Sequence, residues 1–128
     1  MDNRTYFKKI GMQGEAIAAK FLMMNKKYKL VEHNIHAQGG EIDLLMLNPD
    51  REWVAVEVKT RTSNAFGSGK SAITKSKFQK IQRAVRDFFL KQKNYSEVPF
   101  FRIEAVILRI DDGKIFCEHI ENIGHDSF

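Results

Sequence analysis

Apolar positions recur at two spacings along this chain, and these spacings predict helices and strands. Over residues 5–25 they recur every three or four positions, which predicts an amphipathic helix. Gly11 and Gly14 weaken that helix intrinsically, which predicts that another element approaches it closely. A second helix is expected over residues 74–93, where five residues share one apolar arc at about 100° per residue. They are Phe78, Ile81, Val85, Phe88 and Phe89.

Segments rich in branched apolar residues predict strands between and after these helices. They cover residues 28–35, 41–47, 53–60, 101–110 and 114–120. Turn-forming residues 48–52 join the second strand to the third, which predicts a β-hairpin. The resulting order, α-β-β-β-α-β-β, predicts an α/β fold with a mixed central sheet flanked by helices. A chain of 128 residues without a long linker is expected to form one domain over residues 1–128.

The predicted hairpin carries ionisable side chains at its open end. If the turn centres on Asp50, alternation and antiparallel pairing place Asp43 opposite Glu57 and Glu41 opposite Lys59. The other face of the hairpin is expected to be apolar throughout. That face holds Ile42, Leu44, Met46, Val54, Val56 and Val58.

Asp43 and Glu57 would form a like-charge pair, which destabilises a sheet unless it is neutralised. Lys59, on the same face as Glu57, can supply one positive charge, and a divalent cation can supply two. Apolar residues on both faces favour a buried hairpin over the alternative, a surface hairpin with solvated acids. A buried Asp, Glu and Lys suit metal-assisted phosphodiester cleavage, in which the lysine orients or deprotonates a water, or stabilises developing negative charge.

Charge is concentrated in one part of the chain. The whole sequence has a net charge of +5, but residues 61–93 hold nine Lys and Arg against one acid, a local +8. This excess indicates a polyanionic partner, most simply nucleic acid, and the alternative is a solvated basic helix face. The basic residues expected to bind nucleic acid are Arg61, Lys70, Lys75, Lys77, Lys80, Arg83 and Arg86.

Composition narrows the class of protein. Hydrophobic residues make up 43% and charged residues 29%, as in globular domains, so disorder is not expected. The single cysteine, Cys117, excludes an internal disulfide and suits a reducing compartment. No apolar run has the length of a membrane span, and the N-terminal residues lack the apolar stretch of a signal peptide. A cytoplasmic protein is therefore expected.

Two sets of residues resemble known families. Ile42-Asp43, thirteen intervening residues and Glu57-Val58-Lys59 resemble the D…(D/E)-x-K signature of the PD-(D/E)XK nucleases, which have a restriction-endonuclease-like α-β-β-β-α-β core. A longer set resembles the YraN-type uncharacterised bacterial family, which is similar to archaeal Holliday-junction resolvases. The matching positions are residues 11–18, Asn34, residues 40–44, residues 56–61, Lys77 and residues 102–104.

The resemblance implies roles for particular residues. Asp43 and Glu57, with the main-chain carbonyl of Val58, would hold Mg²⁺ or Mn²⁺, and Lys59 would be the catalytic lysine. Glu15 matches a glutamate that resolvase-like members carry on the first helix near the metal; the alternative is an ordinary exposed glutamate. The implied substrate is DNA, in branched or structured form, and the implied assembly is a homodimer.

Three classes of function follow from these observations. The first is a metal-dependent DNA endonuclease that uses Glu15, Asp43, Glu57 and Lys59. The second is a nucleic-acid-binding module of the same fold without catalytic activity. The third is a structural or partner-binding protein, which would show no salt-dependent affinity for nucleic acid.

Overall fold

A computed structural model describes residues 3–61, 73–92, 96–124 and 128, with the side chains of the first helix described from Gln13 onward. Seven elements follow one another in the predicted order. They are α1 (Asn3–Asn25), β1 (Lys29–Ala37), β2 (Gly40–Leu47), β3 (Trp53–Arg61), α2 (Lys75–Leu90), β4 (Phe101–Asp111) and β5 (Lys114–Ile123). Within the described ranges no helix has the length and apolar character needed to cross a membrane.

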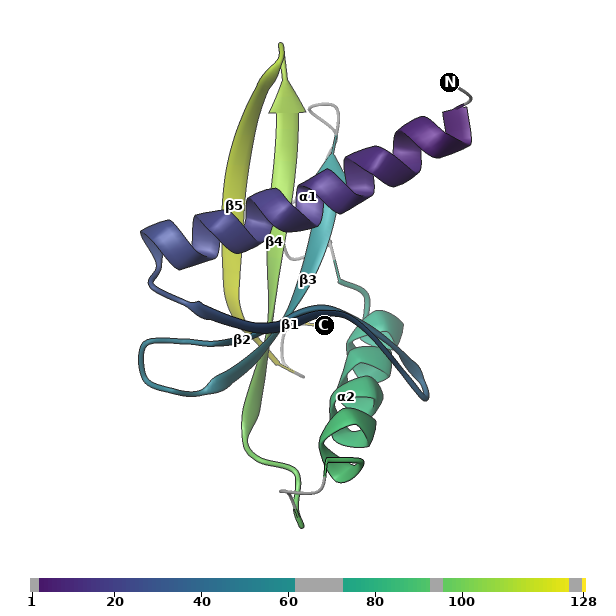
Figure 1. The fold of residues 1–128 in the computed structure, drawn as a ribbon, viewed down its shortest axis with the longest axis vertical. Helices are drawn as coiled ribbons and strands as arrows, with labels where there is room; N and C mark the ends of the chain where they lie inside the picture. The colour runs from purple at the N-terminus through teal and green to yellow at the C-terminus, as the bar shows by residue number, and fades with distance from the viewer. Residues whose placement is uncertain (1–2, 62–72, 93–95, 125–127) are drawn as a thin grey trace.

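The five strands form one mixed sheet in the order β1-β2-β3-β4-β5. Neighbouring strands are antiparallel except β3 and β4, which run parallel. Parallel strands need a crossover connection, and α2 lies within the segment that joins them. Figure 1 shows α1 crossing the sheet and α2 lying beside it. The structure thus confirms the predicted α/β fold with a mixed sheet flanked by helices.

Each helix covers one face of the sheet, so the core has two parts. The part under α2 contains Ile35, Ile42, Leu45, Ala55, Ile73, Phe78, Ile81, Ala84, Val85, Phe89, Ile103 and Ala105. The part under α1 contains Ala18, Ala19, Leu22, Leu44, Met46, Val54, Val56, Val106 and Leu108. Successive residues of β3 alternate between the two parts, as a strand buried on both sides requires. This confirms that the predicted hairpin is buried.

Helix α1 comes close to the sheet at Gly14. A Cβ atom at this position would lie 3.1 Å from Thr60 Oγ1 and 3.2 Å from Leu108 Cδ1, which is tight for a side chain. The close approach predicted from the glycines is therefore confirmed at Gly14. Gly11 lies in the part of α1 whose side-chain surroundings are outside the described set.

The pairing of β1 with β2 corrects one sequence prediction. Ile42 was expected to share a face with Leu44, but Ile42 packs under α2 and Leu44 under α1. Opposite this change of face, in β1, Asn34 has a left-handed conformation with φ of 51°. Such a residue breaks the alternation of side chains along a strand. Ile35, the next residue, pairs with Ile42 and points with it toward α2.

Candidate active site

Strands β2 and β3 pair in the predicted register, but only near their turn. The pairs are Leu47 with Trp53, Met46 with Val54, Leu45 with Ala55, and Leu44 with Val56. Beyond them Oδ2 of Asp43 accepts a hydrogen bond from the main-chain N–H of Val58, at 2.9 Å. A carboxylate thus replaces a main-chain acceptor at the open end of the hairpin.

The predicted pairings of Asp43 with Glu57 and of Glu41 with Lys59 are not formed in this ladder. Glu41 instead pairs with His36 of β1, and its Oε1 lies 3.3 Å from Nδ1 of that histidine. Where the ladder ends, the side chain of Asp43, rather than its main chain, contacts β3. Lys59 is left to turn toward Glu57, its neighbour on the same strand face.

Glu57 is the buried acid at the centre of this group. Only 5% of its surface is exposed, and its Oε1 lies 3.4 Å from Nζ of Lys59 and 3.8 Å from Nζ of Lys77. Burial raises the pKa of Glu57 above its ordinary value, and the charge of Asp43 raises it further. Both lysines act in the opposite direction. Burial and the charge of Asp43 therefore destabilise the ionised form of Glu57. The two lysines stabilise that form.

Asp43 has similar electrostatics at a more open position. Burial raises its pKa, while the N–H of Val58 and the charges of Lys77 and Lys59 lower it, and the net change is upward. The ionised form of Asp43 is therefore less stable in the folded protein than in the unfolded chain. Strands β2 and β3 and helix α2 meet in one charged cluster, which we define as Asp43, Glu57, Lys59 and Lys77.

Glu15 lies near this charged cluster, on α1. Burial raises its pKa, the charge of Asp43 raises it further, and a hydrogen bond from Asn34 opposes the shift. Glu15 also lines a cavity of about 240 Å³ together with His33, Asn34 and residues of α1, β1 and β2. The electrostatic proximity of Glu15 to Asp43 agrees with its predicted location, and its role as a metal ligand stays a prediction.

The donor atoms present suit a hard divalent cation. Two carboxylates and a neighbouring main-chain carbonyl are oxygen ligands of the kind that Mg²⁺ and Mn²⁺ prefer. Across the described residues, no three Asp, Glu, His or Cys side chains gather closely enough to hold a metal ion. A metal at the charged cluster would thus rest on Asp43 and Glu57, the carbonyl of Val58, and water.

The predicted nucleic-acid-binding residues fall into three groups. Four of them are exposed on α2: Lys75, Lys80, Arg83 and Arg86. Arg61 is exposed at the end of β3, whereas Lys70 lies outside the described residues. Lys77 is half-buried and turns toward Glu57, which separates it from the others. The apolar face of α2 is the predicted one, with Ala84 added and Phe88 only partly buried.

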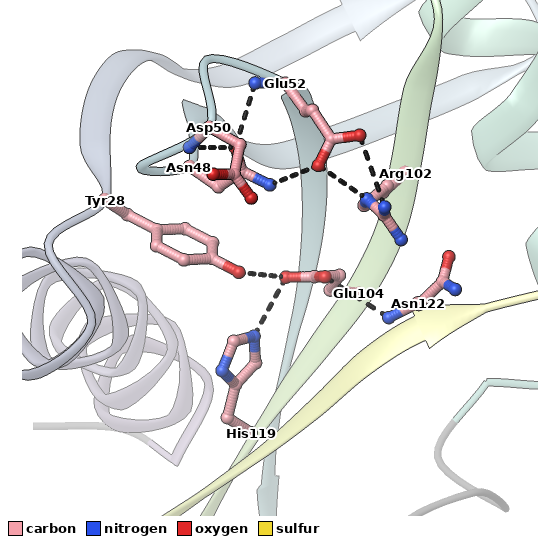
Figure 2. A network of polar contacts seen from close by, with 8 residues as sticks. All are labelled: Tyr28, Asn48, Asp50, Glu52, Arg102, Glu104, His119 and Asn122. Atoms are coloured by element: carbon pink, nitrogen blue, oxygen red, sulfur yellow. Dashed lines mark hydrogen bonds and ion pairs between the residues drawn. The ribbon is translucent and has the colours of Figure 1, made fainter.

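A second polar cluster lies on the α1 side of the sheet, and sequence reasoning assigned it no role. Glu104 is 2% exposed, and its Oε1 accepts from the Tyr28 hydroxyl at 2.7 Å and lies 2.9 Å from His119 Nε2. Its Oε2 accepts from the main-chain N–H of Asn122 at 3.2 Å. Figure 2 shows these contacts converging on Glu104. The signal in the sequence is an acid within the apolar strand β4.

The hydrogen bonds make Glu104 a stabilising anion. Burial alone would raise its pKa, but the hydrogen bonds from His119, Tyr28 and Asn122 outweigh burial, and the pKa lies below its ordinary value. The three partners come from β5 and from the segment before β1. Glu104 therefore ties the chain after α1 to β4 and β5, on the sheet face opposite Glu57.

Comparisons with known proteins place the chain among bacterial sequences. Residues 14–111 match the family described as "Uncharacterised protein family UPF0102". A UPF0102 protein of Syntrophomonas wolfei is 37% identical over 117 residues, which cover 90% of this chain and 96% of the relative. A UPF0102 protein of Pelobacter propionicus is 34% identical over 122 residues, which cover 94% and 83% of the two chains.

Among solved structures, a repair endonuclease has a more distant similarity to this chain. The crystal structure of a repair endonuclease from Pyrococcus abyssi superposes with a TM-score of 0.45 at 18% sequence identity. The match covers 77% of this chain and 39% of the endonuclease chain, so this chain spans well under half of that protein. A similarity with this TM-score and sequence identity does not indicate a function for this chain.

Replacing Asp43 by asparagine should stabilise the protein in the absence of metal. An amide oxygen can still accept from the Val58 N–H, while the buried charge that acts on Glu57 is removed. Because the pKa of Asp43 is raised in the folded protein, we expect D43N to increase the free energy of unfolding at pH 7 and to raise the melting temperature. Thermal unfolding in EDTA measures this, with D50N in the exposed turn as the matched control. A lower melting temperature for D43N than for D50N would contradict the interpretation.

Replacing Glu104 by glutamine should change how stability depends on pH. A lowered native pKa means that the unfolded chain binds more protons, so the stabilisation is present above the ordinary glutamate pKa and is lost as pH falls. We expect E104Q to cost about 1–3 kcal/mol at pH 7 and to flatten the loss of stability on acidification. Urea unfolding between neutral and acidic pH tests this. The exposed Glu97, as E97Q, is the control, and parallel curves for wild type and E104Q would contradict the assignment.

Proposed function

We propose that this chain, which belongs to Uncharacterised protein family UPF0102 as its YraN-type residues predicted, is a metal-dependent endonuclease that cleaves phosphodiester bonds in DNA. The observation that carries the proposal is the convergence of Asp43, Glu57 and Lys59 at the open end of the β2–β3 hairpin. A buried acid pair beside a lysine lowers the stability of the fold, which favours a role in chemistry over a role in packing.

Asp43, Glu57 and the carbonyl of Val58 would hold Mg²⁺ or Mn²⁺, and Glu15 would act from α1. Oε1 of Glu57 faces the two lysines and Oδ2 of Asp43 binds the Val58 N–H, so the second oxygen of each carboxylate is the expected ligand. The bound ion would supply electrophilic activation of the phosphate and of a water molecule. The charge that destabilises the metal-free site would then be compensated.

Lys59 would act on the attacking water or on the phosphate. Hydrolysis forms a bond from the water oxygen to phosphorus, breaks the bond from phosphorus to the leaving oxygen, and transfers a proton from the water to that oxygen. A lysine at this place orients or deprotonates the water, or stabilises the added negative charge. Its side chain is about one-third exposed and its Nζ lies 3.4 Å from Glu57, so solvent and substrate can reach it.

The basic face of α2 supports DNA as the substrate. Lys75, Lys80, Arg83 and Arg86 are exposed, and within the described ranges none of them forms an ion pair with an acid. Unpaired cations on one helix face are suited to the phosphates of a nucleic acid. The helix begins beside the charged cluster, so phosphates bound along α2 would lead toward Glu57.

The resemblance to Holliday-junction resolvases is the reason to propose branched or structured DNA. A four-way junction presents paired strands, so a symmetric homodimer is the assembly suited to it. Both features rest on that resemblance, whereas DNA cleavage itself rests on the charged cluster.

A second candidate is a nucleic-acid-binding module of the same fold that does not cleave. The observation that favours it is the neutralisation of Glu57 by Lys59 and Lys77, which stabilises the acids without a metal. In this case the basic face of α2 would bind DNA and the acids would hold α2 against the hairpin.

Cleavage of labelled DNA separates the two candidates. The panel would hold duplex, single strand, flap and four-way junction, each in Mg²⁺, Mn²⁺ or EDTA. We expect metal-dependent products from the wild type and a loss of about a hundredfold or more in D43N and in K59A, because each lacks a group required for the reaction. The exposed D50N is the matched control. DNA binding without products in every condition would favour the binding module.

Removing the basic face should weaken DNA binding in a salt-dependent way. We expect the triple variant K80A/R83A/R86A to bind DNA less tightly and to lower the slope of log affinity against log salt by about two to three, close to one for each phosphate that is no longer neutralised. Fluorescence anisotropy at several salt concentrations measures both quantities. A triple alanine variant at exposed Lys20, Lys26 and Lys29 is the control, and an unaltered slope for the α2 variant would place the DNA elsewhere.

A further inference from the structure

Lys77 is held differently from every other basic residue of α2. Thr74 caps the helix, and its Oγ1 accepts from the main-chain N–H of Lys77 at 3.1 Å. The capped first turn fixes the main chain of Lys77, and its side chain extends to the sheet, 3.8 Å from Oε1 of Glu57. Lys77 is the one α2 residue for which the described part of the chain shows an ion pair with the sheet.

The first turn of α2 is an unfavourable place for lysine. A helix N-terminus carries partial positive charge, and this one has no acidic residue in its first turn but has Lys75 and Lys77. Positions that break a local rule without a local gain tend to be functional. The gain for Lys77 lies outside the helix, at the buried carboxylate of Glu57.

We propose that Lys77 is a second lysine of the catalytic centre, which holds Glu57 in the metal-free protein and turns to the substrate phosphate when a divalent cation and DNA are bound. The inference rests on the proposed function and deepens it. Lys77 would then take part in the reaction, in contrast to the other basic residues of α2, which would only bind the DNA backbone.

Formal charges in the charged cluster support this assignment. Asp43 and Glu57 carry two negative charges and Lys59 and Lys77 two positive charges, so these four residues balance, and the nearby Glu15 adds one negative charge. With two charges added by a divalent cation, the centre would carry a net positive charge until an anion enters. A phosphodiester brings one negative charge, and the transition state of its hydrolysis gains another. The lysine pair therefore favours metal together with phosphate over metal alone.

Lys77 is the better placed of the two lysines to move. Lys59 follows Glu57 on the same strand face at 3.4 Å, whereas Lys77 comes from another element at 3.8 Å. Both side chains are about one-third exposed, so neither is fixed by burial. A long flexible side chain with an anchored main chain can exchange a carboxylate for a phosphate without any motion of α2.

Calorimetric titration with Mn²⁺ of the DNA-free protein tests the inference without any cleavage. We expect K77Q to bind Mn²⁺ about tenfold more tightly than wild type, because a positive charge beside the ligands is removed. K77R keeps that charge and should retain the wild-type affinity. K20Q, at an exposed lysine of α1 that lies outside both the charged cluster and the basic face of α2, is the matched control and should also retain it. Thermal unfolding by circular dichroism verifies that each variant is folded.

Cleavage by the same variants gives the second readout. At saturating DNA and Mn²⁺ we expect K77Q to lower the single-turnover rate about a hundredfold, and K77R to recover part of the loss, since a positive charge at the phosphate is restored. Equal Mn²⁺ affinity and equal rate for K77Q and wild type would overturn the inference while leaving the nuclease intact. Tighter Mn²⁺ binding by K77Q, in a protein that cleaves no DNA, would keep Lys77 at the metal centre and contradict the proposed function. A wild type that binds no Mn²⁺ would overturn both.

Discussion

β3 and β4 run parallel, and parallel neighbours cannot be joined by a tight turn. The chain must leave the end of β3, cross one face of the sheet and return to the start of β4, and α2 forms in that crossover. Its first turn consequently lies near the end of β3, where Glu57 and Lys59 are. Lys77 can reach Glu57 only because of this topology.

The buried acids on the two faces of the sheet are stabilised in different ways. Burial destabilises the anions of Asp43 and Glu57, and cations from two elements stabilise them. Glu104, on the other face, is buried as deeply but has hydrogen-bond donors from Tyr28 and Asn122 and a contact with His119. One buried acid is therefore satisfied by fixed hydrogen bonds, whereas the acids of the cluster have lysines that a ligand can draw away. That difference separates a structural site from a reactive one.

Local patterns were sufficient to predict the elements and much of the site. Alternation along β2 and β3 predicted the register from Leu47 to Leu44, because a buried strand specifies its faces strongly. The same alternation failed at Ile42, where the face of β2 changes beside the left-handed Asn34 of β1, because a pattern read along one strand does not show the conformation of its neighbour. The role of Lys77 also escaped, since charge density along a helix cannot distinguish a surface lysine from one that reaches a strand twenty residues earlier.

The irregular course of β1 has an effect beyond the site. This strand forms one edge of the sheet, and an edge presents main-chain groups to which a strand of another molecule can add. Its register shifts between Leu30 and Glu32, and Asn34 interrupts it again a few residues later. Glu32, His33 and Asn34 are exposed polar residues in this stretch, next to the exposed Val31. Kinks and charge on an edge strand oppose intermolecular pairing, so the irregular course of β1 also protects this edge from aggregation.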